Sequence, residues 1–421
     1  MKKVCIITIV FLFLTAYSAE AEDALTWQEC VRHAKRNHPD LISAAEEVKQ
    51  TKADLDIDIS AMSPDITSAA SAKRARSATS GNTQNTYAHS ITGEQLIFDG
   101  FKTSSEVSNA FKTLKAQEYN YNVTSSDIRL NLRGAFVGLL KAQELISLTE
   151  QIAGRRKQNL ELVKLRYEAG REHKGSLLTA EADLAQAEFE VAQARRSIIL
   201  AQRQLSKELG LGKMKPWKVK GEFSIEEDYS LKPDLEDIAL TTPFLNELIE
   251  KKEAARYKLQ SEQSDFFPEV YLNSSVGRTG TSILPRGKQW SAGASISFPL
   301  FEGGSRMVDI TKARSQFDQA KADERSGRDS VLVTLETMWK NLQDAIATVE
   351  VKKKFLEAAE ERARIATAQY EKGLTSFDDW VIIEDNLVSA RKDYLTAQAN
   401  MLSTEAYWIQ AVGGTLEYDE E

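Results

Sequence analysis

Few side chains in this 421-residue chain have the type and spacing that catalysis or metal binding requires. The four histidines, His33, His38, His89 and His173, are too scattered to form a ligand cluster by spacing. The sequence contains no recognisable Ser-His-Asp arrangement or glycine-rich phosphate loop, and its isolated acidic residues are typical of solvated helix faces. Cys30 is most simply a small apolar helix residue. We therefore expect no catalytic residue, no metal site and no cofactor.

The N-terminus has the pattern of a secretion signal. Two lysines precede the apolar run Val4–Ala16, and Ala19-Glu20-Ala21 follows as a cleavage site, so we predict a signal peptide over residues 1–21. Removing its two lysines and one glutamate from the 54 basic and 62 acidic residues leaves a net charge of −9, which argues against a nucleic-acid partner. No later apolar stretch reaches the roughly 20 residues of a membrane-spanning helix.

The chain contains two copies of one plan. RYEAG at 166–170 returns as QYEKG at 369–373, and earlier proline pairs are separated by nearly the same interval. Positions that match at this offset are Phe98 and Phe301, Asp99 and Glu302, Gly100 and Gly303, Tyr167 and Tyr370, and Gly170 and Gly373. A period this long indicates a duplicated half-domain rather than a solenoid.

Each half predicts the same order of elements: a helix of about 25 residues, a β-hairpin, one long helix and a returning helix. We predict a first repeat over 22–212, a linker over 213–234 and a second repeat over 235–421. The predicted hairpins, long helices and returning helices cover 64–98, 101–169 and 176–209 in the first repeat, and 268–301, 304–372 and 376–412 in the second. A helix over 101–169 is roughly 100 Å long, and heptads on the returning helices indicate coiled-coil packing.

The hairpins predict four strands of about 9 to 12 residues in which apolar and polar side chains alternate. The pattern is clearest between Trp290 and Phe298, where the intervening residues are serine and glycine. Tilted strands of this length can cross a membrane, but four of them leave open edges, so a closed barrel requires several copies of the chain. The alternative is a soluble β-hairpin cap on a coiled coil.

The order of these motifs resembles the TolC-like outer membrane efflux protein (outer membrane factor) family. The residues that carry the resemblance are LTWQECVRHAKRNHPDL at 25–41, the two Phe-acid-Gly turns and the two Tyr-Glu-x-Gly turns. It implies a mainly α homotrimer with a tunnel of coiled-coil helices in the periplasm and a 12-stranded β-barrel surrounded by outer-membrane lipid. It also implies a passive exit duct of a tripartite efflux pump or type I secretion system, working with a periplasmic adaptor and an inner-membrane pump.

The resemblance further implies a periplasmic entrance beside the hairpin tips marked by Tyr167, Gly170 and Gly373. Family members often carry two aspartates, three residues apart, that form an acidic ring. Asp379 matches the first of them, Ile382 stands at the second, and Asp378 adds a neighbouring carboxylate. Such a ring would favour cations. The alternative is that both aspartates only complement the dipole in the first turn of a helix.

The family's closed entrance is held by a tyrosine, an arginine and an aspartate. Tyr370 matches the tyrosine, but Thr375 replaces the arginine and Ser176 replaces the aspartate. We therefore expect a tunnel that is closed differently or more loosely. The strongest alternative to the duct is a soluble periplasmic coiled-coil adaptor or scaffold protein, although an adaptor has one helical hairpin flanked by β-rich domains and this chain has two.

Overall fold

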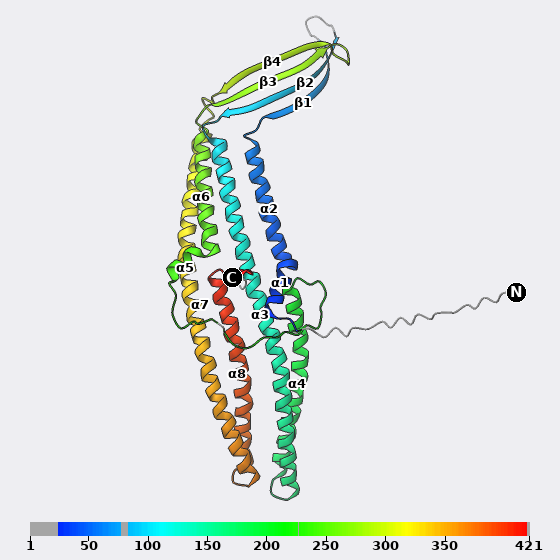
Figure 1. Ribbon diagram of the computed structural model, residues 1–421, viewed down its shortest axis with the longest axis vertical. Helices are drawn as coiled ribbons and strands as arrows, with labels where there is room; N and C mark the ends of the chain where they lie inside the picture. The colour runs from blue at the N-terminus through cyan, green and yellow to red at the C-terminus, as the bar shows by residue number, and fades with distance from the viewer. Residues whose placement is uncertain (1–23, 77–82, 226, 419–421) are drawn as a thin grey trace, which may run out of the picture.

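The computed structural model describes residues 24–76, 83–225 and 227–418. The predicted signal peptide, residues 1–21, lies outside this range. Figure 1 shows an elongated molecule with a sheet at one end and two helical hairpin turns at the other. The long helices run between these two ends, and α8 returns only to the middle of the molecule.

The helices and strands occur in two sets of six. The first set is α1 (Trp27–Asn37), α2 (Pro39–Ser60), β1 (Asp65–Arg76), β2 (Thr83–Phe98), α3 (Lys102–Glu168) and α4 (Lys174–Glu208). The second set is α5 (Leu235–Thr241), α6 (Pro243–Ser264), β3 (Glu269–Gly280), β4 (Gly287–Ser297), α7 (Ser305–Glu371) and α8 (Phe377–Ala411). In both sets the long helix has 67 residues and the returning helix has 35, so the predicted internal repeat is confirmed.

Proline residues open the second helix of each half. Pro39 and Pro243 open α2 and α6 at a first-turn position, where the missing N–H needs no partner. Each of these helices has 22 residues, slightly fewer than the 25 expected.

Residues 213–234, the predicted linker, contain no helix or strand in their described part, apart from one bridge between Val219 and Leu25.

The four strands form one antiparallel sheet in the order β1-β2-β3-β4, so the β2–β3 pairing joins the two halves. β2 has 16 residues, which is longer than the 9 to 12 expected. It is longer because its two ladders are staggered: β1 pairs with Thr83–Glu94 and β3 pairs with Tyr87–Phe98, with an irregularity between Leu96 and Phe98. On the β1 side, the pairing continues to Arg76 and Thr83.

The two faces of the sheet differ in chemistry. Register places Ile66, Ile91, Val276, Trp290 and Ile296 on one face, and all five side chains are exposed in the single chain. We call this the apolar face. The opposite, polar face carries hydroxyl and amide side chains, including Thr67 and Thr92, which share a 2.6 Å hydrogen bond. A mainly helical chain with a four-stranded sheet is the predicted fold class.

Among the described helices, none is both long and apolar enough to cross a membrane.

Candidate functional site

The two hairpin tips have the same backbone geometry. Gly170 (φ 68°) follows α3 and Gly373 (φ 74°) follows α7, and both occupy the left-handed region that glycine adopts without strain. The amide of Arg171 donates to the carbonyl of Arg166 at 2.8 Å, and the amide of Leu374 donates to the carbonyl of Gln369 at 2.9 Å. The predicted tip glycines therefore end both long helices with the same capping motif.

Tyr370 is the centre of an aromatic cluster at this end. Its side chain is fully buried, whereas its repeat equivalent Tyr167 is 38% exposed. The Tyr370 ring stacks on Trp380 at 4.3 Å between centroids, and Phe377 packs against both rings at 6.3 Å. The aromatic rings thus pack α7 against the start of α8.

Polar groups of the first hairpin cover this aromatic cluster. The Tyr370 hydroxyl donates to Glu172 at 2.8 Å, and the Ser176 hydroxyl donates to the other oxygen of Glu172 at 2.9 Å. Arg166 donates to the backbone carbonyl of Tyr370 at 2.7 Å, and its guanidinium lies 4.5 Å from the centre of the Tyr370 ring. A tyrosine–carboxylate contact therefore exists here, with Glu172 as the carboxylate and with Ser176 supporting it.

The contact shifts the pKa values of Glu172 and Tyr370 in opposite directions from their ordinary values. Burial acts to raise the pKa of Glu172, but hydrogen bonds from Tyr370 and Ser176 outweigh it and hold that pKa below its ordinary value. Burial, together with the bond to Glu172, raises the pKa of Tyr370. At neutral pH the contact therefore joins a neutral phenol to a carboxylate, and hydrogen bonds to charged acceptors are the stronger kind.

A second contact between the hairpins lies further along the helices. Arg155 of α3 donates two hydrogen bonds, of 2.6 and 2.7 Å, to the buried carboxylate of Glu384 on α8. The side chains of Asn159 and Thr367 each donate a 3.3 Å hydrogen bond to the carboxylate of Glu384. Burial opposes ionisation of Glu384, but the hydrogen bonds and charge of Arg155 hold its pKa below the ordinary value. The neighbouring Arg156 pairs with Asp385 and, at 3.8 Å, with Asp183.

The predicted acidic positions lie outside this buried cluster. Asp378 and Asp379 are exposed in the first turn of α8, and Ile382 is also exposed. Asp379 accepts a 2.7 Å hydrogen bond from the hydroxyl of the helix-capping residue Ser376. Thr375 is half-buried. In the single chain the two aspartates thus complement the N-terminus of α8, and they are free to face a neighbouring chain or a lumen.

Sequence reasoning missed four residues of the tip: Arg155, Arg166, Glu172 and Glu384. Glu172 carried a detectable signal, because it lies only two residues beyond the tip glycine Gly170. Arg155 and Glu384 carried none, because they are 229 residues apart and each lies within a long, evenly charged helix.

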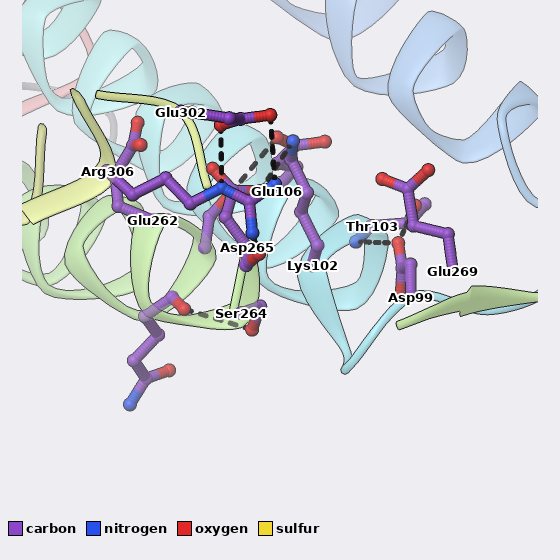
Figure 2. A network of polar contacts seen from close by, with 12 residues as sticks. Asp99, Lys102, Thr103, Glu106, Glu262, Ser264, Asp265, Glu269, Glu302 and Arg306 are labelled. Carbon is purple, nitrogen blue, oxygen red and sulfur yellow. Dashed lines mark hydrogen bonds and ion pairs between the residues drawn. The ribbon is translucent and has the colours of Figure 1, made fainter. Parts of the chain in front are cut away.

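The strand-to-helix turns form a polar cluster at the opposite end (Figure 2). Asp99 accepts hydrogen bonds from the backbone amide and hydroxyl of Thr103, at 2.7 and 2.5 Å, and so caps α3. Glu302 accepts a 2.9 Å bond from Arg306, which also reaches the carbonyl of Asp265. Lys102 pairs with the Asp265 carboxylate at 2.8 Å, so the start of α3 is tied to the end of α6.

The glycine of this motif is required by a close contact. Gly100 has φ +70°, and a Cβ there would lie 2.4 Å from the Cβ of Phe267. Gly303 has a similar φ of 65°.

Six phenylalanines near these turns are exposed in the single chain: Phe98, Phe101, Phe266, Phe267, Phe298 and Phe301. An exposed aromatic band next to an apolar strand face is typical of a membrane interface.

Two parallel helical hairpins, a sheet with one exposed apolar face and an aromatic band between them define an outer-membrane channel protein. The Outer membrane efflux protein family matches residues 30–211 and 238–414, which is most of the chain. The chain belongs to this family. Because the match covers both halves, it decides against the adaptor alternative.

Individual relatives agree with the family. The outer membrane efflux protein BepC of Brucella suis is 21% identical over 409 residues, covering 94% of this chain and 88% of that protein. The alkaline protease secretion protein AprF of Pseudomonas aeruginosa is 21% identical over 334 residues, covering 75% and 68%. The solved structure of the MtrE outer membrane channel of Neisseria gonorrhoeae has a TM-score of 0.84 at 18% identity, covering 94% of this chain and 90% of that one.

These findings confirm the expected class and location. The chain is an outer-membrane exit channel whose family transports molecules and is not enzymatic.

Proposed function

We propose that the chain works as a homotrimer and as the passive exit duct of a tripartite efflux or secretion assembly. The sheet is the observation that carries this proposal. β1 and β4 are the two outer strands, and each has one edge without a partner among the described residues. Open edges are not tolerated in lipid, so neighbouring copies must complete the sheet. Three copies supply twelve strands, which lies within the range of membrane barrels.

In this proposal the helical hairpins of three copies form the periplasmic tunnel, and their tips form its entrance. An adaptor and an energy-supplying inner-membrane pump meet the tunnel on the periplasmic side, because the duct has no energy source of its own. Asp378 and Asp379 lie at the start of α8 and are exposed, so three copies bring six carboxylates toward the axis. The contact between Tyr370 and Glu172 joins the two hairpins within each copy and favours a closed entrance.

Membrane fractionation tests the trimer and its location. The full precursor is expressed, the inner and outer membranes are separated, and the size of the detergent-extracted protein is compared with and without boiling. We expect an outer-membrane species of three-chain size that becomes, on heating, a single chain slightly lighter than the 47.0 kDa precursor. A monomer in the soluble periplasmic fraction would rule out the trimeric duct.

A further inference from the structure

The charged residues of the sheet are divided between its two faces. On the apolar face, the described charged residues are Arg74 and Arg76 of β1, Arg278 of β3 and Lys288 of β4. All four are basic. The polar face carries Asp65, Lys73, Glu94 and Glu269. All three described acidic residues of the strands therefore lie on the polar face.

The basic residues also share one end of the sheet. Arg278 pairs with Lys288 across the β3–β4 ladder, and Arg74 and Arg76 close the far end of β1. All of them lie at the end away from the helices, whereas the three acidic residues lie at the helix end. We call Arg74, Arg76, Arg278 and Lys288 the distal basic band.

Strand geometry places this band at a membrane boundary. Phe298 follows β4 and belongs to the aromatic band at the helix end, and Lys288 lies ten residues earlier. Ten residues correspond to about 33 Å along a strand and to about 25 Å of height at a tilt of about 40°. This height equals the apolar band of an outer-membrane barrel, about 25 Å. If Phe298 lies at the inner boundary, Lys288 lies at the outer one.

Three residues of the band, Arg74, Arg278 and Lys288, have exposed side chains. None of these three forms an ion pair with another described residue. Along β3 the apolar-face residues Leu272, Val276 and Arg278 are exposed, while the polar-face residues between them are half-buried. Their alkyl stems can lie along the apolar surface while the charged groups reach the headgroup layer.

We propose that the distal basic band binds phosphate-bearing lipid of the outer leaflet. This inference rests on the proposed membrane duct. The chemistry is charge complementarity: clustered cationic side chains at headgroup depth attract anionic lipid headgroups, and guanidinium groups bind phosphate in a bidentate manner. A homotrimer presents three such bands, so the lipid also forms a ring that seals the outer rim of the barrel.

Lipid titration with matched variants tests the proposal. The detergent-purified protein is titrated with bis-phosphorylated lipid A and with the same lipid after dephosphorylation, and bound lipid is counted by native mass spectrometry. Wild type should prefer the phosphorylated form. Replacing Arg74, Arg278 and Lys288 by glutamine should weaken its binding about 100-fold, since each charge near an anionic surface contributes about fivefold.

The matched control is the neighbouring residue on the other face. Lys73→Gln removes one charge from the polar face and should change binding less than twofold, whereas Arg74→Gln should weaken it about fivefold. Equal binding of the two lipid forms, wild-type binding by the triple variant, or equal losses in Lys73→Gln and Arg74→Gln would each overturn the proposal.

Conductance separates this proposal from the duct. Wild type and the triple variant are both inserted into neutral phosphatidylcholine bilayers, where the band has no anionic partner. If wild type and the triple variant conduct equally and wild type shows no preference for the phosphorylated lipid, the duct is supported and the lipid site is ruled out. A protein that never inserts and never conducts would overturn both.

Discussion

The two hairpin tips have the same backbone but different side chains. Gly170 and Gly373 follow long helices of the same length, and both helices end with the same pattern of capping hydrogen bonds. His173 and Ser376 each cap the returning helix, because the side chain accepts a hydrogen bond from the backbone amide three residues later. Tyr370 is buried, whereas its equivalent Tyr167 is exposed. The second tip is therefore aromatic, and the first is the polar surface that covers it.

The same divergence applies to the acids. Glu384 is buried and paired with Arg155, whereas its repeat equivalent Glu181 is exposed. Ser176 is buried under Glu172, whereas its equivalent Asp379 is exposed. The two halves therefore share the same helical frame, but at each of these pairs of equivalent positions one side chain is buried and the other is exposed. This provides an internal control for each buried group, in the same chain and at the same depth.

The largest effect is expected from removing the partner of the buried carboxylate. Arg155→Met leaves Glu384 charged and buried, which costs about 3 kcal/mol. The control Arg195→Met breaks an exposed pair with Glu150 of similar length and should cost less than about 1 kcal/mol. Thermal unfolding of the detergent-purified proteins measures the difference. Equal melting temperatures would show that the buried pair does not hold the hairpins together.

The next largest effect is expected at the tyrosine contact. Tyr370→Phe keeps the stacked ring but removes the hydroxyl that donates to Glu172, with an expected loss of about 1.5 kcal/mol. Tyr167→Phe removes an exposed hydroxyl and should have almost no effect. In bilayer recordings the first variant should stay open longer than the second. If the open times of the two variants did not differ, the contact between Tyr370 and Glu172 would not stabilise the closed state.

Acidification should weaken the same contacts. The folded-state pKa values of Glu172 and Glu384 lie below their ordinary values, so their contribution is complete above the ordinary pKa and is lost as pH falls through the folded one. The melting temperature should therefore be constant between about pH 7 and pH 5 and fall below about pH 4. The fall should be smaller in Glu172→Gln. An equal fall in that variant would assign the acid sensitivity to other groups.

The smallest effect on stability is expected at the exposed acid. Asp379→Asn should cost at most about 0.5 kcal/mol, because Asp379 contributes only a first-turn charge and one bond with Ser376. If the three copies form an acidic ring, the same change should lower the cation preference and the divalent block of single channels. Unchanged selectivity would leave Asp379 with a helix-capping role only.

The sequence predicted the frame more completely than the site. The repeat was visible because glycine and proline mark turns through backbone chemistry, and these residues recur at a fixed interval. The strands were visible because one face is apolar, although the staggered pairing with β1 and β3 made β2 longer than its pattern indicated.

The tip contacts were only partly predictable. Tyr370 was identified through the resemblance, but its acceptor Glu172 was not. Which face of a long, charged helix is buried depends on how two distant hairpins pack, and local periodicity does not encode this. Arg155 and Glu384 show this most clearly, because nothing in either local sequence distinguishes a buried ion pair from a solvated one.

Single-channel recording in planar lipid bilayers tests the central claim most directly. We expect the purified wild-type protein to insert as a trimer and conduct in brief, discrete openings, and Tyr370→Phe to lengthen them while Tyr167→Phe leaves them unchanged. A stable, membrane-inserted trimer that shows no conductance in any of the three forms would contradict the account of this chain as an exit duct closed at the second hairpin.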